Sequence, residues 1–436
     1  MRRTLPDPAE TARRRARALP GKGLPRATLA LAAALLLPHP AWAHVSERAI
    51  VLLLPTDVYR LVGVLAVIAT IALTLFLPDR ASKWFPERPA FSPPPGAGLA
   101  AHIGFALVAG LIALGYWGPH NPLGNLLPLT LFTFWWLLLL SLAGVVGDFW
   151  KAFNPWAAPL AWLKRGKTKP LPAPLQTWPA LASYLVFAIY YLSDLAPVDP
   201  DHLAKVALAY WLIHFAFALR YGSAWLQQSE GFAVLFSLAG RLSPMDWAAR
   251  RLVFPGARLI IEQPSVALGV FVVTFLAIGS FDGLNETFLW MGLIGINPLE
   301  FPGRSAVIWE NRIGLLGAVT ALNLLFVAVV WLGLILAGGS VQLRAAWPKL
   351  ALTLLPIAMA YHFAHYLPSL LVGMQYWVLA LNDPLENGAH LLGMDWHVTT
   401  GFLNQHSSVR AIWLAQAGAI VIGHMLSILL SHAVAL

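Results

Sequence analysis

The sequence LLPLTLFTFWWLLLLSLAGVVG at residues 126–147 decides the fold class, because it contains no charged side chain and is long enough to cross a membrane. The hydrocarbon core of a bilayer takes about 20 consecutive apolar residues in a helix. A helix also satisfies its own backbone N–H and C=O groups, which lipid cannot do. This segment therefore predicts a transmembrane helix.

The whole chain has the composition of a membrane protein. Of its 436 residues, 58% are hydrophobic and 11% are charged, and the mean hydropathy is +0.67. Charged residues make up about 25% of a soluble domain, so this chain has too little polar surface to cover a water-soluble globule. The 19 tryptophans favour aromatic belts at the two membrane surfaces. The absence of cysteine excludes disulfides, thiolate metal sites and cysteine nucleophiles.

Apolar segments along the chain predict an all-α membrane protein, a bundle of about nine transmembrane helices. Two shorter apolar stretches, 231–239 and 287–296, cannot span a bilayer, and we expect both to be interfacial or re-entrant. The nine predicted spans are residues 59–77, 98–117, 126–147, 178–195, 203–221, 264–281, 313–337, 350–381 and 409–434.

Residues 1–43 predict a signal peptide. A basic start is followed by an apolar run at 27–37 and then by Ala41-Trp42-Ala43, which is an A-x-A cleavage site. Cleavage after Ala43 leaves residues 44–436 as one polytopic transmembrane domain that begins at His44, outside the cytoplasm. The alternative is that the segment stays uncleaved as an anchor.

The basic residues between the spans predict the orientation. With the mature amino end outside, the loops 78–97, 148–177, 222–263 and 338–349 face the cytoplasm. Fifteen Lys and Arg residues lie in or beside these loops, and six lie on the other side. Cytoplasmic loops carry an excess of Lys and Arg, so we expect a cytoplasmic carboxyl terminus. The net charge of +9 follows from this distribution and from the signal peptide, and does not indicate nucleic-acid binding.

Histidines are the main ionisable residues that we place inside the predicted spans. His362 and His365 are three residues apart in the eighth span, so both lie on one helical face. This spacing can give two imidazole ligands to one metal ion. His214 in the fifth span and His424 in the ninth lie at a similar depth and are candidates for further ligands or a general base. The alternative is that each imidazole only hydrogen-bonds a neighbouring helix.

Two other features accompany these histidines. Pro356 and Pro368 flank the pair in the eighth span, and we expect them to free backbone carbonyls and open the helix. Asp383, Glu386 and His390 follow in the next loop and could hold a divalent metal ion at the outer mouth. The alternative for that loop is a solvated polar turn.

The sequence resembles a group of bacterial inner-membrane proteins labelled fenitrothion hydrolase. The resemblance rests on the signal peptide with multiple spans and on four motifs: GDFWKAFNPW at 147–156, ENRIGLLG at 310–317, YHFAHYLPSLL at 361–371 and NDPLENG at 382–388. It implies an enzyme of the bacterial inner membrane that hydrolyses organophosphate triesters as part of a hetero-oligomer, with a second membrane subunit. It supplies the reaction class and no catalytic residues.

Two functional hypotheses follow. In the first, the chain hydrolyses an apolar aryl phosphotriester. A divalent metal ion held by His362 and His365 lowers the pKa of bound water, with His214 and His424 assisting. We expect no carboxylate at the depth of these histidines, although metal hydrolases mostly add carboxylate ligands. In the second, the chain is a non-catalytic transporter or a metal- or haem-handling membrane component that uses the same histidines.

Overall fold

A computed structural model of the chain describes residues 97–435, except 164–167, 261–262, 298–302, 339–341 and 394. Before residue 97 it describes only residues 61, 63–65, 68–69 and 72 and the strand β1 (Arg88–Pro89). The predicted signal peptide therefore lies outside the described residues, as does most of the predicted span 59–77. The structure also separates residues 1–45 from residues 46–436 as two units, and all described residues belong to the second.

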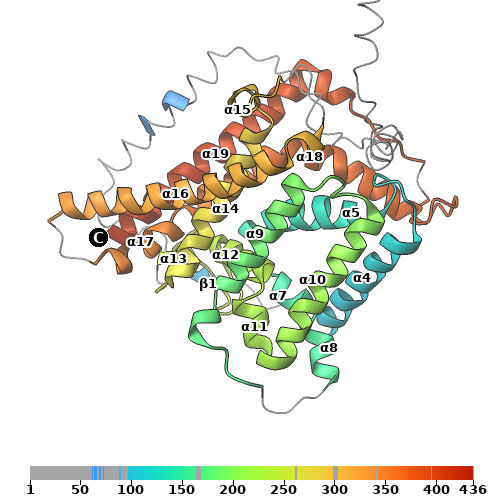
Figure 1. Cartoon of the computed structure of the whole chain (residues 1–436), viewed down its shortest axis with the longest axis horizontal. Helices are drawn as coiled ribbons and strands as arrows, with labels where there is room; N and C mark the ends of the chain where they lie inside the picture. The colour runs from blue at the N-terminus through green and yellow to red at the C-terminus, as the bar shows by residue number, and fades with distance from the viewer. Residues whose placement is uncertain are drawn as a thin grey trace, which may run out of the picture. The chain divides into compact units, whose positions relative to one another are not determined.

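The described chain is built almost entirely from helices (Figure 1). The long ones are α4 (Ala97–Trp117), α9 (Trp178–Ser193), α10 (Pro200–Tyr221), α14 (Val266–Asn285), α16 (Ile308–Leu336), α18 (Leu355–Asn382) and α19 (His406–Ala435). Residues 126–146 form one helical stretch made of α5 (Leu126–Pro128), the π-helix η2 (Leu129–Leu139) and α6 (Leu140–Val146).

Short elements connect these helices. They are α7 (Trp150–Phe153), α8 (Ala157–Trp162), η3 (Ala173–Leu175), α11 (Ser223–Gln228), α12 (Gly231–Leu242), α13 (Ala257–Ile260), α15 (Phe288–Leu293), η5 (Arg304–Ala306), α17 (Leu343–Leu352) and η6 (Gly401–Asn404). A small antiparallel sheet has the strand order β1, β3 (Arg251–Leu252), β2 (Met245–Asp246). In it, Leu252 lies opposite Arg88 on one side and Met245 on the other.

The prediction of an all-α membrane protein is confirmed. Within the described residues, seven helical stretches are long and apolar enough to cross a membrane, and each matches a predicted span. They are 98–117, 126–146, 200–221, 266–285, 308–336, 343–382 and 406–435. The predicted span 178–195 forms α9, which has only 16 residues. Of the nine predicted spans, seven coincide with such helices, one forms a shorter helix, and one lies mostly outside the described residues.

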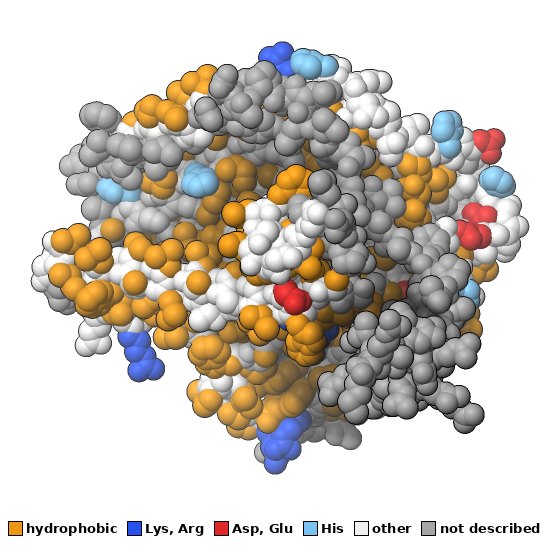
Figure 2. Space-filling view, turned by 45° about the horizontal axis from the view of Figure 1, so that its top comes forward, with side chains coloured by type: hydrophobic (Ala, Val, Ile, Leu, Met, Phe, Trp, Pro, Cys, Tyr) orange, Lys and Arg blue, Asp and Glu red, His pale blue; other side chains and the backbone are white. Residues whose placement is uncertain are grey.

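The surface of the bundle is apolar where a membrane would cover it. Hydrophobic side chains dominate the face drawn in Figure 2, and charged side chains are sparse there. On α16, Leu324, Val329 and Leu332 are more than half exposed. Exposed leucine and valine along a helix that a bilayer covers are favourable, whereas in water they form a patch that drives aggregation.

The predicted re-entrant segment at 231–239 forms α12, which is packed inside the bundle. Leu235, Phe236 and Ala239 are fully buried. The helix begins against α9, where a Cβ atom at Gly231 would lie 2.9 Å from the carbonyl oxygen of Ala180, so glycine is required for this close approach. A helix of 12 residues is too short to span, and protein surrounds its polar ends, as a segment at membrane depth requires.

Helices α14 and α17–α18 lie side by side and run in the same direction. At one end, Gly269 of α14 lies 3.0 Å from Pro348 of α17, measured from a Cβ built on the glycine. At the other end, Gly279 lies 3.2 Å from the Tyr361 ring of α18 by the same measure. This register brings the last turn of α14 against the first half of α18, where the predicted histidine pair lies.

The two prolines of α18 do not open it. Pro356 lies in the first turn, where a missing N–H costs nothing, and the helix continues through Pro368 to Asn382. Pro368 lacks the N–H that would bond the carbonyl of Ala364, and the side-chain amide of Gln416 on α19 donates to that carbonyl at 2.7 Å. The expected freeing of a carbonyl is therefore correct at Ala364, and the neighbouring helix satisfies it.

Candidate functional site

A largely buried carboxylate lies at the contact between α14 and α18. Asp282 accepts a hydrogen bond at Oδ2 from Nε2 of His365, 3.1 Å away, and a second at the same oxygen from the Tyr366 hydroxyl. The side chains of Asp282 and His365 are 11% and 21% exposed. Two helices that cross the membrane thus share a carboxylate, an imidazole and a phenol, which we call the Asp282 cluster.

The expectation of no carboxylate at the depth of the histidines is wrong. The sixth span was predicted to end at residue 281, which placed Asp282 in the following loop. In the structure α14 continues to Asn285, so Asp282 lies on the helix and faces α18. The two donors from α18 explain why the helix continues, since they satisfy the carboxylate that would otherwise favour water.

Tyr361 covers the imidazole of His365. Their rings are stacked, with centroids 5.7 Å apart and planes inclined by 8°. Gly279 and Gly283 of α14 leave the space that the tyrosine occupies, because a Cβ at Gly283 would collide with the Tyr361 hydroxyl and one at Gly279 would lie 3.2 Å from the Tyr361 ring. The spacing of these glycines, four residues apart and flanking Asp282, is the sequence signal that could have indicated a close helix contact here.

His362 is buried and binds a different helix. Its Nε2 donates to the backbone carbonyl of Trp136 at 3.1 Å, and its ring lies edge-on to the Trp136 indole. Trp136 belongs to the π-helix η2. A π-helix offsets its hydrogen bonds from the α pattern and is frequent at functional sites. The hydrogen bond from His362 therefore joins α18 to the π-helix η2.

A small cavity adjoins His362. Its volume open to the centre of a water molecule is about 10 Å³, which is roughly the space for one water. Trp136, Tyr184, Tyr361, His362 and Tyr366 supply the polar atoms of its lining. The lining therefore suits a polar guest no larger than water in this conformation.

The predicted pair His362 and His365 lies on one helix, as expected, but the two rings have different partners. The Tyr366 ring lies against both imidazoles, with centroids 5.1 Å from His362 and 4.6 Å from His365. Within the part of the chain that the structure describes, no three His, Asp or Glu side chains converge as metal ligands. The described residues thus offer Asp282 and His365 as two ligands and do not form a three-ligand centre.

The other two predicted histidines lie apart from the Asp282 cluster. His214 is buried, and its Nδ1 accepts a hydrogen bond from the Trp225 indole at 3.1 Å. Its ring also packs against Tyr210 and Trp156. His424 is exposed on α19, and its Nδ1 contacts the carbonyl oxygen of Ile420 in the preceding turn. Each of these histidines bonds another partner, and among the described residues the four imidazoles do not converge on one site.

The loop after α18 folds on itself. The carboxylate of Asp383 accepts backbone N–H groups of Asn387 and Gly388, at 3.0 and 2.7 Å. His390 lies 3.9 Å from Asp395. These contacts match the alternative of a polar turn, since both carboxylate oxygens of Asp383 accept hydrogen bonds from the backbone of the same loop.

No protein-family model, curated protein or solved structure matches this chain. The chain is therefore identified by its architecture alone, as a multi-pass all-α membrane protein.

Proposed function

We propose that the chain is a proton-coupled membrane transporter in which Asp282 and His365 take up and release the proton. The observation that supports this is the carboxylate–imidazole pair between two membrane-crossing helices. An ionisable side chain at membrane depth is costly, and such residues mark proton relays and substrate pathways. The proposal keeps His365 from the predicted pair and gives it a proton-handling role beside a residue that the sequence had placed in a loop.

The geometry suggests how a proton would change the conformation. Ionised Asp282 accepts from both His365 and Tyr366, so its charge holds α14 against α18. Hydrogen bonds to an ionised acceptor are about twice as strong as those to a neutral one. Protonation of Asp282 therefore weakens this helix contact, and release of the proton restores it. A ligand that favours one of the two states couples its own binding to the proton.

The cavity beside His362 limits only the size and polarity of a transported substrate. The cavity beside His362 holds about one water, so this cavity admits no larger solute in the conformation described. A transporter in this state needs a separation of helices to admit a solute, and the α14–α18 contact is the one that the proton controls.

The test of this proposal is a pH jump applied to the chain reconstituted in liposomes on a solid-supported membrane. We expect a transient charge displacement when the outer pH is changed between about pH 5 and 8, the range in which an imidazole titrates. Protein-free liposomes from the same lipid are the control. A displacement no larger than that of the protein-free liposomes would contradict the proposal.

A second proposal is the hydrolysis of aryl organophosphate triesters. The motif YHFAHYLPSLL, on which the resemblance to fenitrothion hydrolases rests, contains His362, His365 and Tyr366, all of which lie in or beside the Asp282 cluster. In that reaction the Asp282–His365 pair accepts a proton from water, whose oxygen attacks phosphorus while the P–O bond to the aryl group breaks and a phenolate leaves.

Fenitrothion itself is the probe for this second proposal. Membranes that contain the chain, alone and with its candidate second subunit, are expected to release the yellow nitrophenolate product. Absence of product in both preparations excludes the reaction. A metal analysis and a visible spectrum of the same protein test the predicted divalent metal ion and the haem alternative.

The orientation in a bacterial inner membrane is a further proposal, supported by the charge bias of the loops. Because the chain has no cysteine, single cysteines report it cleanly. Asn404→Cys and Ala248→Cys replace exposed residues after α18 and before β3. We expect a membrane-impermeant maleimide to label Asn404→Cys in intact spheroplasts and Ala248→Cys only after lysis. The reverse pattern would invert the topology.

A further inference from the structure

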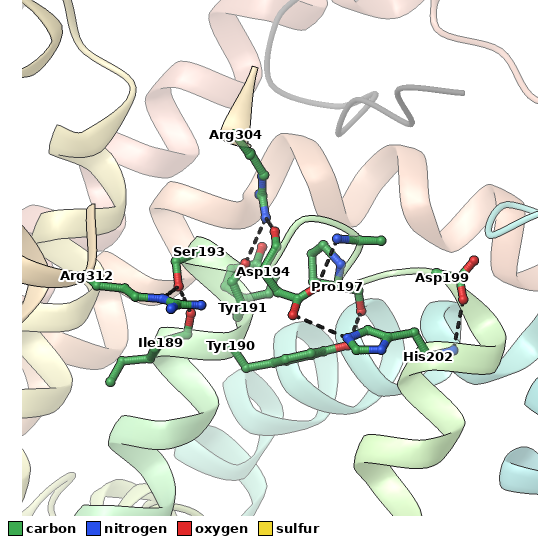
Figure 3. Close-up of polar contacts among 11 residues, drawn as sticks. Ile189, Tyr190, Tyr191, Ser193, Asp194, Pro197, Asp199, His202, Arg304 and Arg312 are labelled. Atoms are coloured by element: carbon green, nitrogen blue, oxygen red, sulfur yellow. Dashed lines mark hydrogen bonds and ion pairs between the residues drawn. The ribbon is translucent and has the colours of Figure 1, made fainter. Parts of the chain in front are cut away.

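Two arginines bind the carboxyl-terminal end of α9 (Figure 3). Nη1 of Arg304 donates to the carbonyl oxygens of Tyr191 and Asp194, each at 3.1 Å. Nε of Arg312 donates to the Ser193 hydroxyl at 3.0 Å. The end of a helix carries partial negative charge on its free carbonyls, which explains why both cations are attracted there.

Neither arginine forms an ion pair with a carboxylate among the described residues. Asp194, whose carbonyl oxygen accepts from Arg304, uses its carboxylate elsewhere: Oδ2 lies 3.3 Å from Nε2 of His202, and Oδ1 accepts the backbone N–H of Ala196 at 2.9 Å. The hydrogen bonds to α9 use one terminal nitrogen of Arg304 and the Nε of Arg312. Two partly buried guanidinium groups thus keep N–H donors that no described protein group accepts.

These arginines lie at one end of the helical bundle. At this end of the bundle α9 and α14 end, and α10 and α16 begin. The Arg312 guanidinium lies 5.1 Å from the ring centroid of Trp309, which is 67% exposed. Tryptophan is enriched where the hydrocarbon core meets the lipid head groups. If Trp309 lies at this boundary, the arginine beside it, Arg312, lies there too, as does Arg304, which binds the same end of α9.

We infer that Arg304 and Arg312 together bind a phosphate group. The planar guanidinium matches phosphate geometry, and its charge-assisted hydrogen bonds are stronger than those to neutral acceptors. Ser193 and the α9 carbonyls hold the two groups in place, so little side-chain entropy is lost on binding. The phosphate belongs either to a phospholipid head group or to a free phosphate ion. This inference does not depend on the transport proposal.

The test compares the purified wild-type chain with the double variant Arg304→Gln/Arg312→Gln. Native mass spectrometry measures the binding of phosphatidylglycerol and of a diacylglycerol with the same acyl chains but no phosphate. Thermal unfolding measures stabilisation by inorganic phosphate. We expect the double variant to bind its phosphate ligand more than about tenfold more weakly, because charge-assisted bonds are lost. Diacylglycerol should bind both chains equally.

The lipid-binding and the thermal-unfolding measurements together identify the source of the phosphate group. A loss of phosphatidylglycerol binding with no response to inorganic phosphate assigns a lipid head group. Stabilisation of the wild type alone by inorganic phosphate assigns a free ion. Equal binding of both ligands to the two chains overturns the inference.

Three further variants distinguish a loss of phosphate binding from a folding defect. Arg410→Gln removes an exposed arginine near the start of α19, at the same end of the bundle, and should leave binding unchanged. Arg312→Lys keeps the charge and loses the planar fork, so it should fall between the wild type and Arg312→Gln. Arg312→Gln removes the hydrogen bond to Ser193 and leaves both bonds of Arg304, so it serves as the test if the double variant does not fold.

Discussion

Asp282→Asn is expected to abolish the charge displacement produced by a pH jump in the reconstituted chain. Asparagine has the size of aspartate and still accepts from His365 or Tyr366, so the α14–α18 contact keeps its shape. It cannot take up a proton, and the charge that moves with the proton disappears. The signal should fall at least about tenfold, to the level of protein-free liposomes, as expected for a proton relay in a membrane.

Two variants separate this loss from a general defect. Glu286→Gln changes an exposed carboxylate four residues further on, at the end of α14, and should keep the full signal. Tyr366→Phe removes one donor to Asp282 and leaves the acid, so the signal should persist with a different dependence on pH. A full signal from Asp282→Asn would place the proton elsewhere and end the assignment to this pair.

Glu230→Ala is expected to cause the largest loss of stability. Glu230 is completely buried at the start of α12. Its two oxygens accept the backbone N–H groups of Phe232 and Ala233, at 2.9 and 2.6 Å, and the Tyr210 hydroxyl donates to the same carboxylate. Alanine leaves three buried donors without acceptors, which costs about 3–5 kcal/mol in total. Thermal unfolding in detergent should show a midpoint lower by about 5 °C or more.

A surface glutamate provides the control for this prediction. Glu310 lies exposed in the first turn of α16. Its interaction with the helix dipole is worth about 0.3–1 kcal/mol, so Glu310→Ala should change the midpoint little. Equal losses in the two variants would show that the carboxylate of Glu230 does not hold α12.

Glu230 should also make stability depend on pH. Burial raises the pKa of Glu230 above its ordinary value of 4.5, and the hydrogen bonds from Tyr210 and from the backbone lower it by less. The folded chain therefore holds the proton more tightly than the unfolded chain. This contribution to stability is complete below about pH 4.5 and is lost as the pH rises through the folded pKa. Glu230→Gln cannot ionise, so its stability relative to the wild type should increase across that window.

The sequence determined the fold class, because the signal for a membrane helix is local. About 20 apolar residues without charge favour a spanning helix whatever their neighbours are. This is why seven predicted spans coincide with helices that are long and apolar enough to cross a membrane, and why α12, with 12 residues, was excluded as too short. The sequence also placed His362 and His365 on one helix, since a spacing of three residues fixes their common face.

Only the tertiary structure decided what those histidines contact. The hydropathy pattern ended the sixth span at residue 281, because an aspartate by itself prefers water. Helix α14 includes Asp282 because α18, more than 70 residues later in the chain, supplies an imidazole and a phenol at that depth. Likewise, Pro368 does not open α18 because Gln416 of another helix satisfies the freed carbonyl. Hydropathy is a property of each segment, whereas satisfaction of a buried polar group depends on which segments meet.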